Sequence, residues 1–188
     1  MRIITGSARG CNLKTPKGMK TRPTSDRVKE SLFSILGHEV VGKRILDIFA
    51  GTGGLGLEAL SRGAEHACLV DKATADVLKY NAEHTHLADR TEIYKGDVFA
   101  IMQRLSAQGQ EFDVVFCDPP YHLGLWERAL LWLDSSDILA DDALIIAEMG
   151  GDENDIPPLS HMRILRNQKY GKTTQIYIFE YKKAGVDK

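Results

Sequence analysis

The chain has 188 residues, 43% of them hydrophobic, and a formal net charge of −2, which suits one domain with a proper core rather than two full domains. Three widely spaced cysteines, Cys11, Cys68 and Cys117, form no C-x-x-C pair, so neither a disulfide framework nor a metal site is expected. The N-terminus lacks the apolar core of a signal peptide and no apolar run approaches the roughly 18 residues of a membrane span, so a cytoplasmic protein is expected.

The N-terminal segment is basic and is predicted to form a small hairpin. Residues 3–5 and 11–14 are typical of two short strands around a glycine-bearing turn, and this hairpin is not expected to contribute to the core. Residues 1–30 hold eight lysine or arginine side chains and two acids, a balance of +6, so the other 158 residues carry −8. This asymmetry is consistent with a basic arm that binds a polyanion. From the charge alone, an ordinary solvated surface that happens to be basic is an equally good explanation. The candidate contacts to the polyanion are Arg9, Lys14, Arg22, Arg27 and Lys29.

A helix is predicted to follow, with Thr24 or Ser25 as its N-cap, apolar residues at helical spacing from Val28 onward, and Gly37 as its natural stop. Strands and helices alternate from Arg44. We expect strands at residues 44–49, 66–70, 91–94, 112–117, 143–149, 163–169 and 174–181, and helices at residues 54–62, 73–86, 98–106 and 125–133.

Repeated strand–helix units imply an α/β fold with a doubly wound, mostly parallel, seven-stranded sheet and right-handed crossovers. The last two strands have Gly171 and no helix between them, so they are predicted to form a C-terminal antiparallel hairpin. The expected organisation is a basic hairpin arm at residues 1–23, one α/β domain at residues 24–183 and a tail at residues 184–188.

A glycine-rich loop is predicted between the first strand of this sheet and the next helix. Gly51-Thr52-Gly53-Gly54-Leu55-Gly56 matches G-x-G-x-x-G in the strand–helix context that nucleotide binding requires. Asp71 ends the next strand, where an acid accepts from ribose hydroxyls, and a dinucleotide fits this much equally well. Leu57 and Glu58 follow the loop and exclude a P-loop.

Two further acids favour a different ligand. Asp47 lies just before the glycine turn, where its charge would oppose a pyrophosphate and could meet a cationic or amino-bearing ligand, which disfavours NAD. Asp97 follows the strand after that of Asp71, where it could accept from an adenine amino group while the N–H of Val98 donates to the ring. Asp97 also suits the N-cap of the following helix, and the two roles are compatible.

A rigid turn ends the strand at residues 112–117. Pro119 and Pro120 lack N–H donors, so the strand stops at Asp118, and ligands of open α/β sheets bind beyond such carboxyl ends. The Asp118 carboxylate and the Pro119 carbonyl would form a stiff pair of acceptors for an exocyclic amine, and Tyr121 a flat face for a nucleobase. Taken alone, an ordinary strand-ending turn with an exposed tyrosine remains a serious alternative.

Acids at three successive strand ends, a glycine turn without a phosphate-binding lysine, and Asp-Pro-Pro-Tyr after the fourth strand resemble the class I S-adenosylmethionine-dependent methyltransferases over residues 44–181. The segment Arg22-Pro23-Thr24-Ser25-Asp26-Arg27-Val28-Lys29-Glu30-Ser31-Leu32-Phe33, behind Gly-Ser-Ala-Arg-Gly, is similar to the bacterial 16S ribosomal RNA guanine-N2 methyltransferase family, as is Tyr170-Gly171-Lys172-Thr173.

This resemblance implies a Rossmann-like sheet, S-adenosylmethionine as cofactor and 16S rRNA as partner. It implies that the cofactor is bound by Asp47, Gly51, Gly53, Asp71, Asp97 and Val98, and the guanine by Asp118, Pro119, Pro120 and Tyr121. Phosphate contacts position an RNA without reading its sequence, so we expect the substrate to be rRNA folded in a small-subunit particle. A monomeric enzyme is expected.

Three alternatives remain. An N-methyltransferase for DNA adenine or protein glutamine shares the chemistry of the site, but no target-recognition domain is evident. An NAD-dependent dehydrogenase fits the glycine loop and leaves Asp-Pro-Pro-Tyr unexplained. A non-enzymatic RNA-binding module accounts for the arm and not for the acids at the strand ends. The guanine-N2 methyltransferase is therefore the preferred hypothesis.

Overall fold

A computed structural model describes residues 1–16 and 25–183. The chain forms two compact units, Met1–Val98 (unit 1) and Phe99–Lys188 (unit 2), and each is described by itself. The predicted boundary between arm and domain, the predicted contact Arg22 and the predicted tail at residues 184–188 lie outside the described residues.

Unit 1 begins with the N-terminal hairpin, which is shorter and more deeply packed than predicted. The two expected strands are reduced to one isolated antiparallel bridge between Arg2 and Asn12. Their backbones still pair, because the Ile3 N–H donates to Cys11 O and the Gly10 N–H donates to Ile3 O, each at 2.9 Å. Ile3 is completely buried, so the expectation that this hairpin contributes nothing to the core is wrong.

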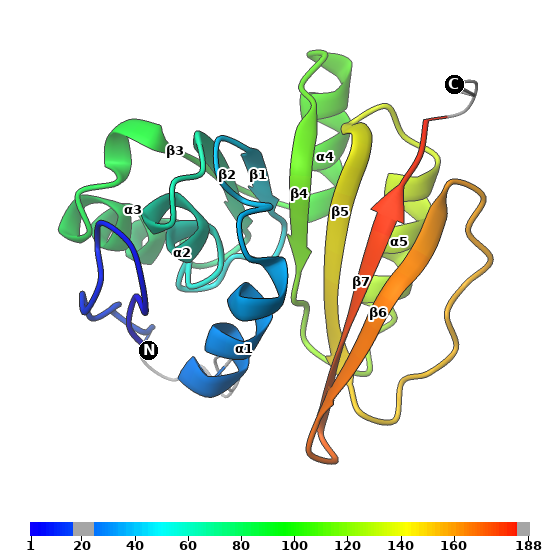
Figure 1. The fold of residues 1–188 in the computed structure, drawn as a ribbon. Helices are drawn as coiled ribbons and strands as arrows, with labels where there is room; N and C mark the ends of the chain where they lie inside the picture. Colours follow the sequence, from blue (N-terminus) through cyan, green and yellow to red (C-terminus); the bar gives the residue numbers. More distant parts are fainter. Residues whose placement is uncertain (17–24, 184–188) are drawn as a thin grey trace. The chain divides into compact units, whose positions relative to one another are not determined.

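The predicted helix α1 is present at Asp26–Leu36. The Ser25 side chain caps it by accepting from the Val28 N–H, and the N–H of Gly37 (φ 54°) donates to the carbonyl of Phe33. The fold of unit 1 continues with β1 (Arg44–Asp47), α2 (Gly56–Ser61), β2 (His66–Asp71), α3 (Ala75–His84), the 3-10 helix η1 (Ala88–Arg90) and β3 (Thr91–Lys95). The three strands are parallel in the order β3-β2-β1 (Figure 1). The apolar residues of β1 and β2 are buried.

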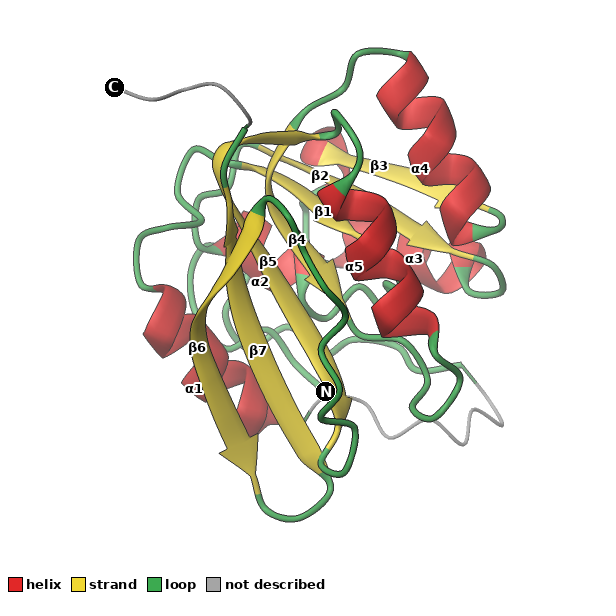
Figure 2. Ribbon diagram, turned by 90° about the vertical axis from the view of Figure 1, so that its right-hand side faces the viewer, coloured by secondary structure: helices red, strands yellow, loops and turns green. Residues whose placement is uncertain are grey.

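Unit 2 combines parallel and antiparallel strands. Its elements are α4 (Val98–Ala107, which starts at the last residue of unit 1), β4 (Phe112–Cys117), α5 (Leu125–Asp134), β5 (Leu139–Gly150), β6 (Met162–Tyr170) and β7 (Thr174–Tyr181). β4 pairs parallel with β5, β5 pairs antiparallel with β7, and β7 pairs antiparallel with β6 (Figure 2). The predicted C-terminal hairpin is therefore confirmed.

The seven strands, ordered β3-β2-β1 in unit 1 and β4-β5-β7-β6 in unit 2, confirm the predicted α/β class with a mostly parallel sheet. β5 starts four residues earlier than predicted. The register against β4 shifts between Phe112 and Val114, and Asp142 has φ 61°, so this irregular beginning lacks the alternation expected of a strand.

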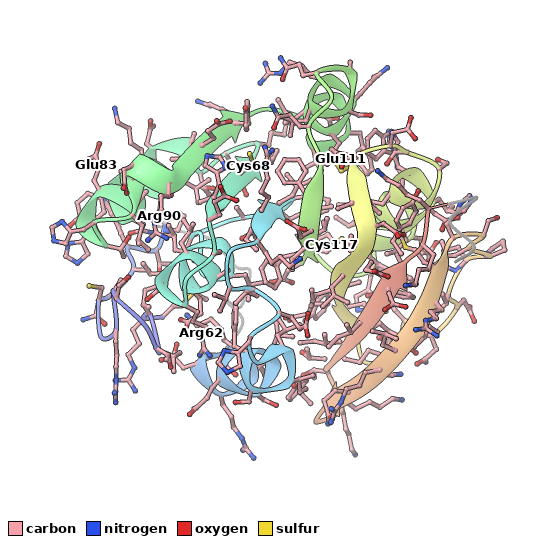
Figure 3. All side chains as sticks on the ribbon, turned by 45° about the horizontal axis from the view of Figure 1, so that its top comes forward. Arg62, Cys68, Glu83, Arg90, Glu111 and Cys117 are labelled. Carbon is pink, nitrogen blue, oxygen red and sulfur yellow. The ribbon has the colours of Figure 1, made fainter. Side chains whose placement is uncertain are left out.

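Cys11, Cys68 and Cys117 are free, and Figure 3 labels the latter two on β2 and β4. None of the helices in the described residues is long and apolar enough to cross a membrane.

Candidate active site

The glycine loop connects β1 to α2 in a conformation that requires glycine at two positions. Gly51 (φ 54°) and Gly53 (φ 79°) occupy the left-handed region. A Cβ at Gly53 would approach Leu57 Cδ1 to 3.0 Å, whereas a Cβ at Gly51 would meet nothing nearer than Phe49 O at 3.9 Å. The backbone at Gly51 is therefore open to close approach by a ligand.

Asp47 lies beneath the loop. Its carboxylate, in a residue that is only 2% exposed, accepts from the Gly56 N–H at 3.0 Å and so ties the end of β1 to the start of α2. A Cβ at position 56 would come within 2.3 Å of Leu69 Cδ2, so a larger residue there would displace the Leu69 side chain. Burial raises the pKa of Asp47 to about 7, opposed by the Gly56 N–H and reinforced by the charge of Asp71. Asp47 therefore positions the loop, and its contact to a ligand stays a prediction.

Asp71 closes the other side of the loop. One carboxylate oxygen accepts from the Gly51 N–H at 3.1 Å, and the other accepts from the N–H groups of Ala73 and Thr74 at 2.7 and 2.9 Å. A carboxylate has about four lone-pair sites, so these bonds leave acceptor capacity for a hydroxyl group. The sequence predicted the position of Asp71 and missed its backbone partners.

The third acid follows the next strand of unit 1. Asp97 is exposed, and Val98, the first residue of α4, is buried. Because β1, β2 and β3 are parallel neighbours, Asp47, Asp71 and Asp97 lie at or just beyond the same ends of these strands. The structure thus brings together the cofactor residues that the sequence predicted, although their contacts to the cofactor stay predictions.

Asn81 on α3 is a site residue that the sequence analysis missed. Its fully buried side-chain amide donates to Thr52 O of the glycine loop at 2.8 Å and to Lys14 O at 3.0 Å, and it accepts from the Lys14 N–H at 2.8 Å. The Thr52 hydroxyl also contacts Met1 Sδ at 3.3 Å. The N-terminal arm and the glycine loop are therefore held by one side chain. The sequence did contain a signal for this role, because Asn81 is a polar residue on the same buried side of α3 as Leu78.

The predicted RNA contacts differ in accessibility. Arg9, Lys14 and Arg27 are exposed, and the Lys14 ammonium lies 4.9 Å from the centre of the Tyr80 ring. The prediction for Lys29 is wrong, because its side chain is 0% exposed and cannot reach a phosphate.

Lys29 instead belongs to a buried ionic cluster with Glu58 and Arg62. Its ammonium lies 3.4 Å from Glu58 Oε2 and donates to Arg2 O at 2.5 Å. Arg62 (labelled in Figure 3) donates to Glu58 Oε1 at 2.8 Å and stacks over the Phe33 ring. Burial lowers the pKa of Lys29, and the charge of Glu58 opposes this effect. The cluster joins the arm to α1 and α2.

The Asp-Pro-Pro-Tyr turn follows β4 in unit 2, as predicted. β4 ends at Cys117, Asp118 and Tyr121 are half-buried, Pro119 is buried and Pro120 is exposed. The Tyr121 hydroxyl donates to Glu148 Oε1 at 2.6 Å, and its oxygen lies 3.2 Å from Thr174 Oγ1. Burial and the charge of Glu148 raise the pKa of Tyr121, so the phenol stays protonated. The ring is thus held from β5 and β7 and is not a freely rotating exposed side chain.

A second acid, Glu153, fixes the residues after this turn. One oxygen accepts from the His122 N–H at 3.1 Å and from Trp126 Nε1 at 3.0 Å, and the other accepts from the Gly150 N–H at 2.7 Å. Gln175 Nε2 donates to Gly150 O and Glu153 O at 3.0 and 2.7 Å. Neither Glu148 nor Glu153 was singled out from the sequence. Together they tether both ends of the segment from Tyr121 to Trp126.

Parallel strands followed by acids, a glycine loop and an Asp-Pro-Pro-Tyr turn define a Rossmann-like methyltransferase. The chain belongs to the family described as Conserved hypothetical protein 95, whose model matches residues 1–179. YlbH of Bacillus subtilis is 36% identical over 98% of this chain and 100% of its own length. Ribosomal RNA small subunit methyltransferase D of Escherichia coli is 36% identical over 98% of this chain and 92% of its own. The solved structure of yhhF from Escherichia coli has a TM-score of 0.83 at 36% identity and covers 97% of this chain and 98% of that chain.

Proposed function

We propose that this protein transfers a methyl group from S-adenosylmethionine to the exocyclic N2 of a guanine in 16S rRNA. The observation that carries the proposal is the turn from Asp118 to Tyr121, which combines an acid, a rigid backbone and a tethered aromatic ring. An exocyclic amine with two N–H donors suits the acceptors of this turn. The name of the Escherichia coli relative, a ribosomal RNA small subunit methyltransferase, supports the same substrate.

S-adenosylmethionine is the cofactor, and the residues of unit 1 fit it. The open backbone at Gly51 admits close approach, and the carboxylates of Asp71 and Asp97 suit the ribose hydroxyls and the adenine amino group. A buried acid under the loop, Asp47, suits a cationic ligand better than a pyrophosphate. When bound, S-adenosylmethionine supplies an activated methyl group on a sulfonium.

The residues of the turn would assist the transfer by electrostatics and orientation. The guanine N2 amine is a poor nucleophile because its lone pair is delocalised into the ring. Hydrogen bonds from this amine to the Asp118 carboxylate and the Pro119 carbonyl would favour a pyramidal nitrogen and stabilise the positive charge that develops. Tyr121 would replace the stacking that the guanine loses when it leaves its neighbours. Holding both reactants aligned provides much of the remaining acceleration.

The substrate is rRNA folded in a small-subunit particle in the cytoplasm. The exposed cations Arg9, Lys14 and Arg27 of the N-terminal segment supply phosphate contacts, which position the RNA without selecting one guanine. Selection therefore depends on the folded shape of the RNA. Protein-free 16S rRNA is expected to be methylated more slowly than the particle.

The test uses small subunits that lack the modification. Purified protein is incubated with them and with S-adenosylmethionine that carries a labelled methyl group, and the digested rRNA is analysed by mass spectrometry. Labelled N2-methylguanosine is expected with the particle, less with protein-free 16S rRNA, and none with particles that already carry it. Label on adenosine or on protein would support the rival N-methyltransferases, and tight NAD binding in calorimetry would support the dehydrogenase.

A further inference from the structure

Unit 2 carries an acid-free basic segment that lies far in sequence from the N-terminal arm. Residues 99–188 contain nine lysine or arginine side chains and fourteen acids. Four of the nine, Arg163, Arg166, Lys169 and Lys172, fall within residues 159–173, where there is no aspartate or glutamate. We name these four residues the β6 strip. An otherwise acidic unit thus concentrates positive charge on one hairpin.

Three residues of the β6 strip lie on an edge strand, and Lys172 lies in the turn that follows it. β6 stands last in the strand order, and among the described residues it pairs only with β7, as Figures 1 and 2 show. Residues 163–167, Lys169 and Lys172 are exposed, whereas residues 175–179 of β7 are buried. The β7 partners Glu180, Ile178 and Gln175 place Arg163 and Arg166 on one face of the hairpin and Lys169 on the other. Six residues of strand span about 20 Å, so these cations flank the exposed edge over a length of several phosphates of an RNA strand.

Three of the four cations are available to a partner. Arg163 pairs with Glu180, with 2.6 Å between Nη2 and Oε2. Within residues 1–16 and 25–183, no carboxylate lies within ion-pair distance of Arg166, Lys169 or Lys172. Their charges are therefore not neutralised by the described part of the chain.

Protection of a sheet edge from aggregation does not account for this pattern. Charged side chains, lysine above all, protect an edge strand, but they do so where the strand does not also expose apolar side chains. Here all the charges are positive in an acidic unit, and the strand also exposes Ile164 and Leu165, at 51% and 47%. Exposed apolar side chains on an edge strand favour association with other chains and so counteract this protection. Ligand contact explains both the single sign of the charge and the exposed apolar pair.

We propose that the β6 strip is a second RNA-binding surface, which contacts the phosphates of the rRNA that this protein modifies. The inference rests on the proposed function and adds to it a contact from unit 2. The N-terminal segment of unit 1 and the β6 strip of unit 2 then both bind the polyanion, so the RNA is held on each unit. Phosphate contacts of this kind orient the substrate and leave the choice of guanine to the Asp118–Tyr121 turn and to RNA shape.

The test compares two triple variants of equal net charge. The strip variant is Arg166→Gln, Lys169→Gln and Lys172→Gln, and the control is Lys79→Gln, Lys95→Gln and Arg104→Gln, which removes three exposed cations from α3, β3 and α4. Binding to protein-free 16S rRNA and to small subunits is measured from about 50 to 200 mM salt. The strip variant is expected to bind both more weakly than the control, with the slope of log affinity against log salt flatter by about 2–3.

Circular dichroism and calorimetry with S-adenosylmethionine show whether the strip variant keeps its fold and its cofactor site. If the wild type binds and methylates rRNA while the strip variant and the control bind it equally, the β6 strip is not an RNA surface and the proposed function stands. If the wild type neither binds nor methylates rRNA, the proposed function fails and this inference with it. A loss confined to assembled subunits assigns the strip to a ribosomal protein and overturns the RNA contact.

Discussion

Replacement of Asp47 by asparagine should change the pH dependence of folding. The pKa of Asp47 is about 7 in the folded protein and 3.8 in a solvated reference. The folded state therefore binds an extra proton between about pH 4 and pH 7, and the associated stability, fully present below pH 4, is lost as the pH rises through 7. The difference between the two pKa values corresponds to about 4 kcal/mol.

The asparagine side chain would keep the acceptor for the Gly56 N–H and would have no charge to bury. Its NH₂ group costs about 1–3 kcal/mol if it finds no acceptor. We therefore expect Asp47→Asn to be more stable than the wild type by about 1–3 kcal/mol at pH 8 and less stable by a similar amount below pH 4. The two stability curves should cross.

Urea unfolding followed by circular dichroism, repeated across this pH range, measures both curves. Asp76→Asn, at an exposed position on α3, is the matched control and should follow the wild type. Parallel curves for the wild type and Asp47→Asn would refute the reasoning, because they would mean that Asp47 titrates alike in the folded and unfolded states.

Three further predictions concern the loop and the turn. Asp118→Ala should leave folding and cofactor binding nearly intact and lower single-turnover methyl transfer by about 100-fold or more, and a rate near that of the wild type would remove its electrostatic role. Asn81→Ala should weaken cofactor affinity in calorimetry and lower stability by about 2–4 kcal/mol, because it removes the side-chain partner of Thr52 O and of the Lys14 backbone N–H and carbonyl. Thr85→Val, at the C-cap of the same helix, should lower only stability. Tyr121→Phe keeps the aromatic ring but loses its hydrogen bond to Glu148, whereas Tyr121→Ala also loses stacking worth about 1–3 kcal/mol. Tyr121→Phe should therefore slow methyl transfer less than Tyr121→Ala. Equal rates for the two variants would contradict a stacking role.

The sequence was sufficient where local chemistry decides the structure. Two prolines without N–H donors ended β4 at the predicted residue, and Gly51 and Gly53 occupy the positive φ values that the loop needs. Alternating strands and helices were enough to predict that β1, β2 and β3 are parallel, because strand–helix–strand units with right-handed crossovers give parallel strands.

Contacts between residues distant in sequence could not be predicted in this way. Asn81 binds Lys14, 67 positions away, and Tyr121 binds Glu148, 27 positions away, and nothing local indicates either pair. Lys29 is different, since it lies three and four residues before the buried Leu32 and Phe33 of α1. Its position on the apolar stripe of the helix indicated that Lys29 is buried, but the prediction relied on its positive charge instead.

The buried cluster around Glu58 affects how an arm deletion should be interpreted. Glu58 accepts from the N–H groups of Ile4 and Thr5 at 2.7 and 3.1 Å while it neutralises Lys29 and Arg62. Removing residues 1–13 would strip away these donors and uncover a charge pair that is now completely shielded from solvent, so an armless protein would lose stability whatever its affinity for RNA. A failure of such a protein to methylate its substrate would therefore reveal nothing about substrate recognition. Point substitutions of Arg9 and Arg27 separate the two effects, because both residues are exposed to solvent and neither belongs to this cluster.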